Sequence, residues 1–142
     1  MEYKNIVVAV DGSQASEKAF KKSLDIAKRN HARLILAHVV DSRTFASAEA
    51  YDRTLSERAD SYAKELLDTY VENAKTAGVK DLVRSVAYGS PKVKIAKDIA
   101  QDFEADLIIC GATGMSAVER FLIGSVSESI TRYASCDVLV VR

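Results

Sequence analysis

The sequence predicts a single doubly wound α/β domain, in which helices cover both faces of a five-stranded parallel sheet. Two observations support this prediction: five short β-rich runs recur along the chain, and segments with helical periodicity separate them. Strands that alternate with helices are typical of right-handed βαβ crossovers, which build such a sheet. A chain of 142 residues with 48% hydrophobic content fits one domain with a sizeable core.

Most of the expected strands are continuous apolar runs, as strands buried on both faces of a parallel sheet usually are. The third run is the exception, because it contains Arg84 and Ser85, and it is therefore expected at an edge of the sheet. The five runs are Ile6–Val10, Leu34–Val40, Leu82–Tyr88, Leu107–Cys110 and Val138–Val141.

Four helices are expected, each with apolar residues three or four positions apart. The third opens at Ser90-Pro91, a serine N-cap followed by proline at the first helical position, and the fourth begins near Ser125. Residues 41–52 fit either a loop or an early extension of the second helix. The tyrosines Tyr51, Tyr62 and Tyr70 follow helical spacing and predict a stripe that faces either the core or a partner. The residues expected on the apolar faces are Ala15, Ala19, Phe20, Leu24 and Ala27 in the first helix (Ser13 to Arg29); Leu55, Ala59, Tyr62, Leu66, Tyr70 and Ala77 in the second, which Gly78 closes; Val93, Ala96, Ala100 and Phe103 in the third; and Val126, Ile130 and Tyr133 in the fourth.

Charge and cysteine content argue against several classes of protein. Lys plus Arg number 20 and Asp plus Glu number 20, so the chain lacks the positive charge that carries most non-specific binding to nucleic acids or membrane surfaces. The two cysteines, Cys110 and Cys136, form no C-x-x-C pair and indicate a reducing compartment. The apolar run Ile6–Val10 is too short for a signal-peptide core or a membrane span. A cytoplasmic protein is therefore expected.

Chemistry is expected where the strands end, because ligands of an open parallel sheet bind outside the carboxyl ends of its strands. The first strand is followed by Asp11-Gly12-Ser13. The fourth is followed by Gly111-Ala112-Thr113-Gly114 and, after nine residues, by Gly124-Ser125-Val126-Ser127. Glycines let a backbone approach a ligand closely, and free amides at a helix start attract phosphate. This spacing predicts an anion cradle near the C-terminus.

The same residues also have a purely structural interpretation. Ser125 and Glu128 fit a capping box, with Ser125 as the N-cap and Glu128 reaching back to it. Asp11 fits an Asx turn or a cap for the first helix. Both uses can coexist with ligand binding, because capping satisfies only some of the four free amides of a helix start.

Other residue types provide no site. His31 is expected in a surface turn, and His38 in a strand with its ring satisfied, since neither has an acid–base partner nearby in sequence. Two histidines and two distant cysteines give no metal-ligand spacing. The chain contains no P-loop motif and no G-x-G-x-x-G, which disfavours a P-loop ATPase or an NAD enzyme. No catalytic residue is assigned.

The glycine motif resembles that of the universal stress proteins, in the branch of the family that binds ATP. Gly111-x-x-Gly114, nine residues and Gly124-Ser125 match that motif in spacing and in residue type. One departure is Asp137, where the family commonly has proline before the final strand. The resemblance covers the whole chain, so residues 1–142 are expected to form one nucleotide-binding domain of this family. The matching segments are residues 6–13, 38–41, 105–111 and 138–142.

The resemblance implies a role for each matched position. Asp11 would fix the nucleoside, and Ala9 and Val39 would frame the adenine, with the Val39 backbone reading its edge. Gly111 would lie near the ribose, and the later residues of the motif would contact the phosphates. A Mg²⁺ or Mn²⁺ ion would bridge phosphate oxygens, because such ions keep few protein ligands. The implied site residues are Ala9, Val10, Asp11, Val39, Gly111, Gly114, Gly124, Ser125, Val126 and Ser127.

The expected function is that of a cytoplasmic ATP-binding stress-response or regulatory protein with at most slow ATP hydrolysis. A genuine ATPase is one alternative, but it needs charge stabilisation at the γ-phosphate, and Arg120 in the spacer is the one basic residue inside the motif. A nucleotide-free protein-interaction module of the same fold is the other, and the intact motif argues against it.

The last strand predicts a homodimer. In a sheet ordered 3-2-1-4-5, Val138–Val141 would form the second edge, and an exposed apolar edge invites pairing with another chain. Members of the family often dimerise through this strand, antiparallel to its copy. The alternative is that a helix covers the edge.

Overall fold

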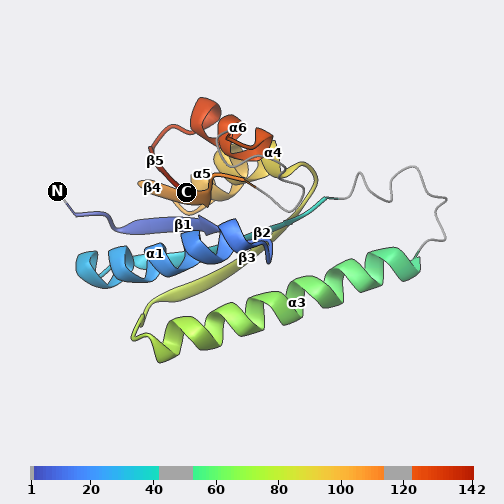
Figure 1. Ribbon diagram of the computed structural model, residues 1–142, viewed down its shortest axis with the longest axis horizontal. Coiled ribbons are helices and arrows are strands. Elements are labelled where there is room, and N and C mark those ends of the chain that lie inside the picture. The colour runs from blue at the N-terminus through green and yellow to red at the C-terminus, as the bar shows by residue number, and fades with distance from the viewer. Residues whose placement is uncertain (1, 42–52, 114–122) are drawn as a thin grey trace.

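The computed structural model describes residues 2–41, 53–113 and 123–142. It confirms a single α/β domain whose five strands are all parallel and lie in the order β3-β2-β1-β4-β5 (Figure 1). Each strand boundary lies within one residue of the prediction, and β3 is an edge strand as predicted. The strands are β1 (Asn5–Ala9), β2 (Arg33–Val40), β3 (Leu82–Tyr88), β4 (Leu107–Gly111) and β5 (Asp137–Val141).

Helices cover both faces of the sheet, which explains why its central strands are continuously apolar. Side chains alternate between the faces along β1: Ile6 and Val8 face α1 and α3, whereas Val7 faces the α4–η1–α5 segment and α6. Figure 1 shows α3 and α6 on opposite sides of the sheet. The helices are α1 (Gln14–Asn30), α3 (Arg53–Thr76), α4 (Pro91–Val93), the π-helix η1 (Lys94–Ile99), α5 (Ala100–Asp102) and α6 (Ser125–Tyr133).

The buried stripe of α3 differs from the prediction in the N-terminal half of the helix. Leu55, predicted on the apolar face, is 40% exposed, and Tyr62, predicted to face either the core or a partner, is 46% exposed. Further along, Tyr70 is buried as predicted and packs edge-on against Phe20, with 4.6 Å between the ring centroids. Figure 1 shows the reason: the N-terminal half of this long helix extends beyond the sheet. The buried residues of α3 are Ala63, Leu67, Tyr70 and Ala74.

The third predicted helix begins correctly and then changes pitch. It starts at Pro91 with Ser90 in the N-cap position, although the serine side chain makes no capping bond. It then continues as η1, whose i→i+5 bonding widens the turn and rotates the buried face relative to a regular helix. Val93 is therefore 43% exposed rather than in the core, and Ile95 and Ile99 are buried instead.

The last strand pairs regularly in spite of Asp137. β4 and β5 stay in register from Leu107 opposite Asp137 to Gly111 opposite Val141. The Asp137 carboxylate accepts a hydrogen bond of 2.8 Å from the Tyr3 hydroxyl, and this bond raises the pKa of that hydroxyl. The apolar residues of β5 are half-buried rather than buried on both faces, because β5 is the second edge of the sheet.

We predict that Leu67→Ala lowers the free energy of unfolding by about 2–5 kcal/mol, because this fully buried side chain leaves a cavity. Leu55→Ala in the same helix is the matched control and should change the free energy by less than about 1 kcal/mol. Urea unfolding followed by circular dichroism compares the two variants. Equal losses would contradict the buried stripe described above.

Candidate functional site

The candidate site lies where the strand order reverses, between the carboxyl ends of β1 and β4. From β1 the chain builds the sheet outward through β2 and β3, and then returns to add β4 and β5 on the other side. Open parallel sheets bind ligands at such a switch point. The turn that begins with Asp11 follows β1 here, and Ala112 follows β4. The Ala112 carbonyl accepts a 2.6 Å bond from the Gly124 amide, which places the start of α6 at the same edge.

The N-terminus of α6 presents backbone amides. Its first intrahelical bond runs 3.0 Å from the Glu128 amide to the Gly124 carbonyl. The amides of Ser125, Val126 and Ser127 precede that bond, so they have no carbonyl one turn earlier in the helix. The predicted capping box is wrong: Gly124 is the N-cap, and the Glu128 carboxylate pairs with Arg132 at 2.9 Å.

The two serines of α6 differ in their surroundings. Ser125 is exposed, so its hydroxyl is accessible beside the free amides. Ser127 is 4% exposed, and its hydroxyl donates to the carbonyl of Gly111 at the end of β4. A serine hydroxyl has one proton to donate, and that of Ser127 is already engaged. Ser127 therefore fixes α6 to β4, and what it presents to a ligand is its amide.

Gly111 is a glycine because α1 approaches it closely. A Cβ on this residue would lie 2.7 Å from the backbone carbonyl carbon and oxygen of Ala15, a separation that real Cβ atoms essentially never show. The glycine is therefore required by the packing of α1 on β4, independently of any ligand.

Asp11 forms an Asx turn, as the structural interpretation of this residue predicted. Its Oδ1 accepts a 2.9 Å bond from the Ser13 amide, and its own amide donates to the Ser16 hydroxyl at 2.9 Å. Ser13 in turn caps α1 by accepting a 3.1 Å bond from the Ser16 amide. The second carboxylate oxygen of Asp11, Oδ2, has no hydrogen-bond partner within residues 2–41, 53–113 and 123–142.

The remaining predicted contacts divide between the two faces of the sheet. Ala9 and Val39 are half-buried on the face that η1 and α6 cover. Val10 is 3% exposed in the core of the opposite face, its amide donates to the Ala37 carbonyl at 2.9 Å, and its carbonyl lies 2.8 Å from His38 Nδ1, so its side chain and both its backbone groups are engaged within the fold. Gly114 lies outside the described residues.

Tyr62 lies beside this site, although its position in the sequence did not indicate a site role. Its hydroxyl donates to the Asp11 carbonyl at 3.3 Å. The two residues are 51 positions apart, and the helical spacing of Tyr62 indicated only a stripe facing the core or a partner, so no sequence signal links them.

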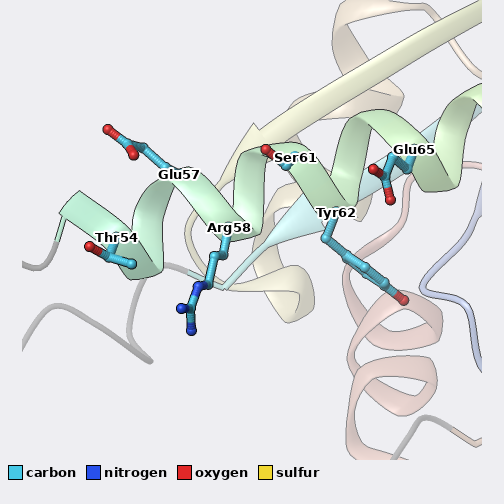
Figure 2. Close-up of a pocket in the computed structure, with 6 residues that line it drawn as sticks. All are labelled: Thr54, Glu57, Arg58, Ser61, Tyr62 and Glu65. Atoms are coloured by element: carbon cyan, nitrogen blue, oxygen red, sulfur yellow. The ribbon is translucent and has the colours of Figure 1, made fainter.

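An open hollow of about 470 Å³ lies along α3 (Figure 2). Among the described residues, those that line it all belong to α3 and include none of the predicted nucleotide contacts, so its size alone does not make it the ligand site. It touches the candidate site through Tyr62. Its lining residues are Thr54, Glu57, Arg58, Ser61, Tyr62 and Glu65.

The histidines have the structural roles predicted for them. His38 is 7% exposed, and its Nδ1 lies 2.8 Å from the Val10 carbonyl. His31 is an exposed residue with φ of 52° that ends α1. Within the part of the chain that the structure describes, no three His, Cys, Asp or Glu side chains gather as metal ligands. None of the described helices has both the length and the apolar character of a membrane span.

Comparisons with known proteins agree with the fold. The sequence model of the Universal stress protein family matches residues 2–142. A relative from Staphylococcus saprophyticus subsp. saprophyticus, named for that family, is 51% identical over 142 residues, which are 100% of this chain and 85% of the relative. Universal stress protein UspA from Lactobacillus plantarum has a TM-score of 0.89 and 34% identity, covering 100% of this chain and 99% of its own. A universal stress protein crystallised in complex with cAMP has a TM-score of 0.75 and 29% identity, with 100% and 98% coverage.

We predict a pH dependence from Cys110, which is buried next to Gly111. Burial raises the pKa of its thiol from the ordinary 9.0 to about 11. The folded state thus holds this proton more tightly than the unfolded chain, so its contribution to stability is complete below pH 9 and is lost as the pH rises toward 11. The free energy of unfolding should be about 1 kcal/mol lower at pH 10 than at pH 8 because of this group.

Urea unfolding at the two pH values tests this prediction. Cys110→Ala should remove more of the decrease than Cys136→Ala, because Cys136 is only half-buried. A decrease that is the same in the native chain and in Cys110→Ala would refute it.

Proposed function

The chain belongs to the universal stress protein family, and we propose that it is a cytoplasmic stress-response or regulatory protein that binds ATP and hydrolyses it at most slowly. Residues 1–142 then act as one nucleotide-binding domain. The free thiols of Cys110 and Cys136 support the cytoplasmic assignment, because a reducing compartment preserves them. The cAMP complex of a protein that is 29% identical supports an adenine nucleotide as the ligand.

The start of α6 is the observation that carries this proposal. Three consecutive amides are free of intrahelical bonds, and the Gly124–Ala112 bond holds them at the switch point of the sheet. The partial positive charge of a helix N-terminus favours an anion there. We assign the phosphates to the amides of Ser125, Val126 and Ser127 and to the Ser125 hydroxyl. Gly114 keeps the phosphate role that the resemblance gives it.

We assign the nucleoside to the other half of the site, which the ends of β1, β2 and β4 form. Ala9 and Val39 share one face of the sheet and are small enough to leave room for a flat base. Asp11 offers Oδ2, and an ionised carboxylate accepts hydrogen bonds from groups such as ribose hydroxyls. Gly111 ends β4, which neighbours β1, and its carbonyl accepts the Ser127 hydroxyl of α6, so the ribose would lie near Gly111, between the base and the phosphates.

A divalent ion would be held mainly by the phosphates. The described residues provide no cluster of three metal-ligating side chains, so the donor set does not fit a protein-made cage. Mg²⁺ commonly keeps its waters and binds through substrate phosphates, and Mn²⁺ also suits oxygen ligands. When bound, the ion would neutralise part of the phosphate charge.

We predict that the native chain binds ATP saturably in a calorimetric titration with Mg²⁺. Gly124→Val should weaken ATP binding by at least about tenfold, because the side chain intrudes where charge-assisted bonds to phosphate would form. Adenosine, which lacks phosphate, should bind the variant as it binds the native chain. Ala134→Val is the matched control at the other end of α6, where the backbone is equally extended (ψ of 142° against 160° at Gly124).

Each outcome of this titration has a distinct meaning. Absence of binding, after any co-purified nucleotide has been removed, would leave the nucleotide-free interaction module as the function. Binding accompanied by rapid phosphate release would favour the ATPase. Ser127→Ala cannot replace Gly124→Val as the test. It would remove the hydrogen bond from Ser127 to Gly111, which also fixes α6 to β4.

We also propose that the protein forms a homodimer through β5. The strand is the last of the sheet, and its four apolar residues, Val138–Val141, are half-buried. Antiparallel pairing with a second copy would give the backbone N–H and C=O groups of this edge hydrogen-bond partners and would cover its apolar side chains.

Val140→Lys should make the protein monomeric, because it places a charge on this edge. Val86→Lys on the opposite edge strand β3, at a residue 39% exposed, is the matched control and should leave the dimer intact. Sedimentation equilibrium distinguishes the 15.5 kDa chain from a dimer, and circular dichroism verifies folding. A dimer that survives Val140→Lys but not Val86→Lys would place the interface on β3.

A further inference from the structure

Tyr62 reaches from α3 to the turn that follows β1. Its hydroxyl donates to the Asp11 carbonyl at 3.3 Å, and its ring lies edge-on to that of His38, with 6.2 Å between centroids. Figure 2 shows the side chain directed away from its helix toward the rest of the fold. His38 itself contacts the Val10 carbonyl. The carbonyls of Val10 and Asp11, which directly follow β1, are therefore both contacted by side chains from other elements.

Gly12 makes this contact possible. A Cβ on Gly12 would lie 2.5 Å from the Tyr62 hydroxyl oxygen, and the residue has φ of +83°, a conformation that glycine adopts without strain. The turn and the tyrosine are thus complementary in shape as well as hydrogen-bonded.

The contact completes the immobilisation of Asp11. Ser16 holds its amide, Ser13 holds Oδ1, and Tyr62 holds its carbonyl. Because the backbone and Oδ1 of Asp11 are both held, the carboxylate cannot rotate freely, and the direction of its second oxygen, Oδ2, is fixed as well. That oxygen is the group of Asp11 available to a ligand in the nucleoside half of the site.

Core packing does not account for Tyr62. The side chain is 46% exposed, whereas Tyr70 two turns later is 4% exposed and packs on Phe20. A tyrosine that is half in solvent gains little from burial, so its distinguishing contact is the one to Asp11.

We propose that Tyr62 is a positioning residue for the nucleoside, acting through Asp11, whose Oδ2 accepts a hydrogen bond from a ribose hydroxyl. This inference rests on the proposed ATP binding. It assigns to α3, which contributes no predicted nucleotide contact, a part in recognising the sugar.

The test compares Tyr62→Phe with the native chain by calorimetry. The variant removes the hydroxyl and keeps the ring, so it should weaken ATP, ADP and AMP by the same factor, about two- to tenfold. It should not alter the affinity for 2′,3′-dideoxy-ATP, which has no ribose hydroxyl for Asp11 to bind. A loss of general stability would weaken all four ligands alike. Tyr88→Phe is the matched control, because it removes a 2.8 Å bond to Asp60 of the same helix from a tyrosine that is 52% exposed.

The outcomes separate this inference from the function on which it rests. If the native chain binds no nucleotide, the proposed function fails and the role of Tyr62 fails with it. If the native chain binds ATP and Tyr62→Phe binds it equally well, the role of Tyr62 alone is refuted. A loss that persists with dideoxy-ATP, or that equals the effect of Tyr88→Phe, also refutes it.

Discussion

The close approach of α1 to β4 at Gly111 is the constraint on which the site depends. A Cβ at this position would collide with the backbone of Ala15, in the first turn of α1. The absence of a side chain lets that turn lie directly on the sheet, beside the switch point. The connection from β1 to α1 must then be tight, which accounts for the Asx turn of Asp11, the positive φ of Gly12 and the capping of α1 by Ser13.

The same glycine also orients the helix on the opposite face. Its carbonyl accepts the hydroxyl proton of Ser127, so α1 and α6 are both positioned relative to one residue of β4. Gly111 would therefore be needed even in a protein without a ligand. For that reason the glycine spacing is weaker evidence for nucleotide binding than the pattern alone implies. The stronger evidence is the row of amides at the start of α6, which the fold holds in place and leaves without intrahelical partners.

The sequence predicted the strands and helices that depend on local pattern. It did not predict the features that depend on how those elements pack against one another. Strand boundaries were accurate because strands covered on both faces are apolar throughout, and the polar residues of β3 identified an edge. Periodicity misplaced Val93, because the π-turns of η1 break the 3.6-residue spacing of a regular α-helix. It also placed Leu55 on the apolar face and left Tyr62 facing either the core or a partner, since a helical pattern does not reveal where the supporting sheet ends. The capping box failed because Gly124, bound to Ala112, occupies the N-cap.

The two halves of the proposed site would recognise a ligand in different ways. Backbone amides at a helix start bind any phosphate chain, so they supply affinity but do not distinguish one nucleotide from another. In the proposed site, selectivity would come from the nucleoside half, where Ala9 and Val39 would limit the space for the base and Asp11 would offer a hydrogen-bond acceptor. An acceptor discriminates only if its direction is fixed, because a mobile carboxylate can follow a misplaced ligand. If the proposed site binds a nucleotide, the contacts that immobilise Asp11, including the one from Tyr62, would therefore matter more for which nucleotide binds than for whether a phosphate binds at all.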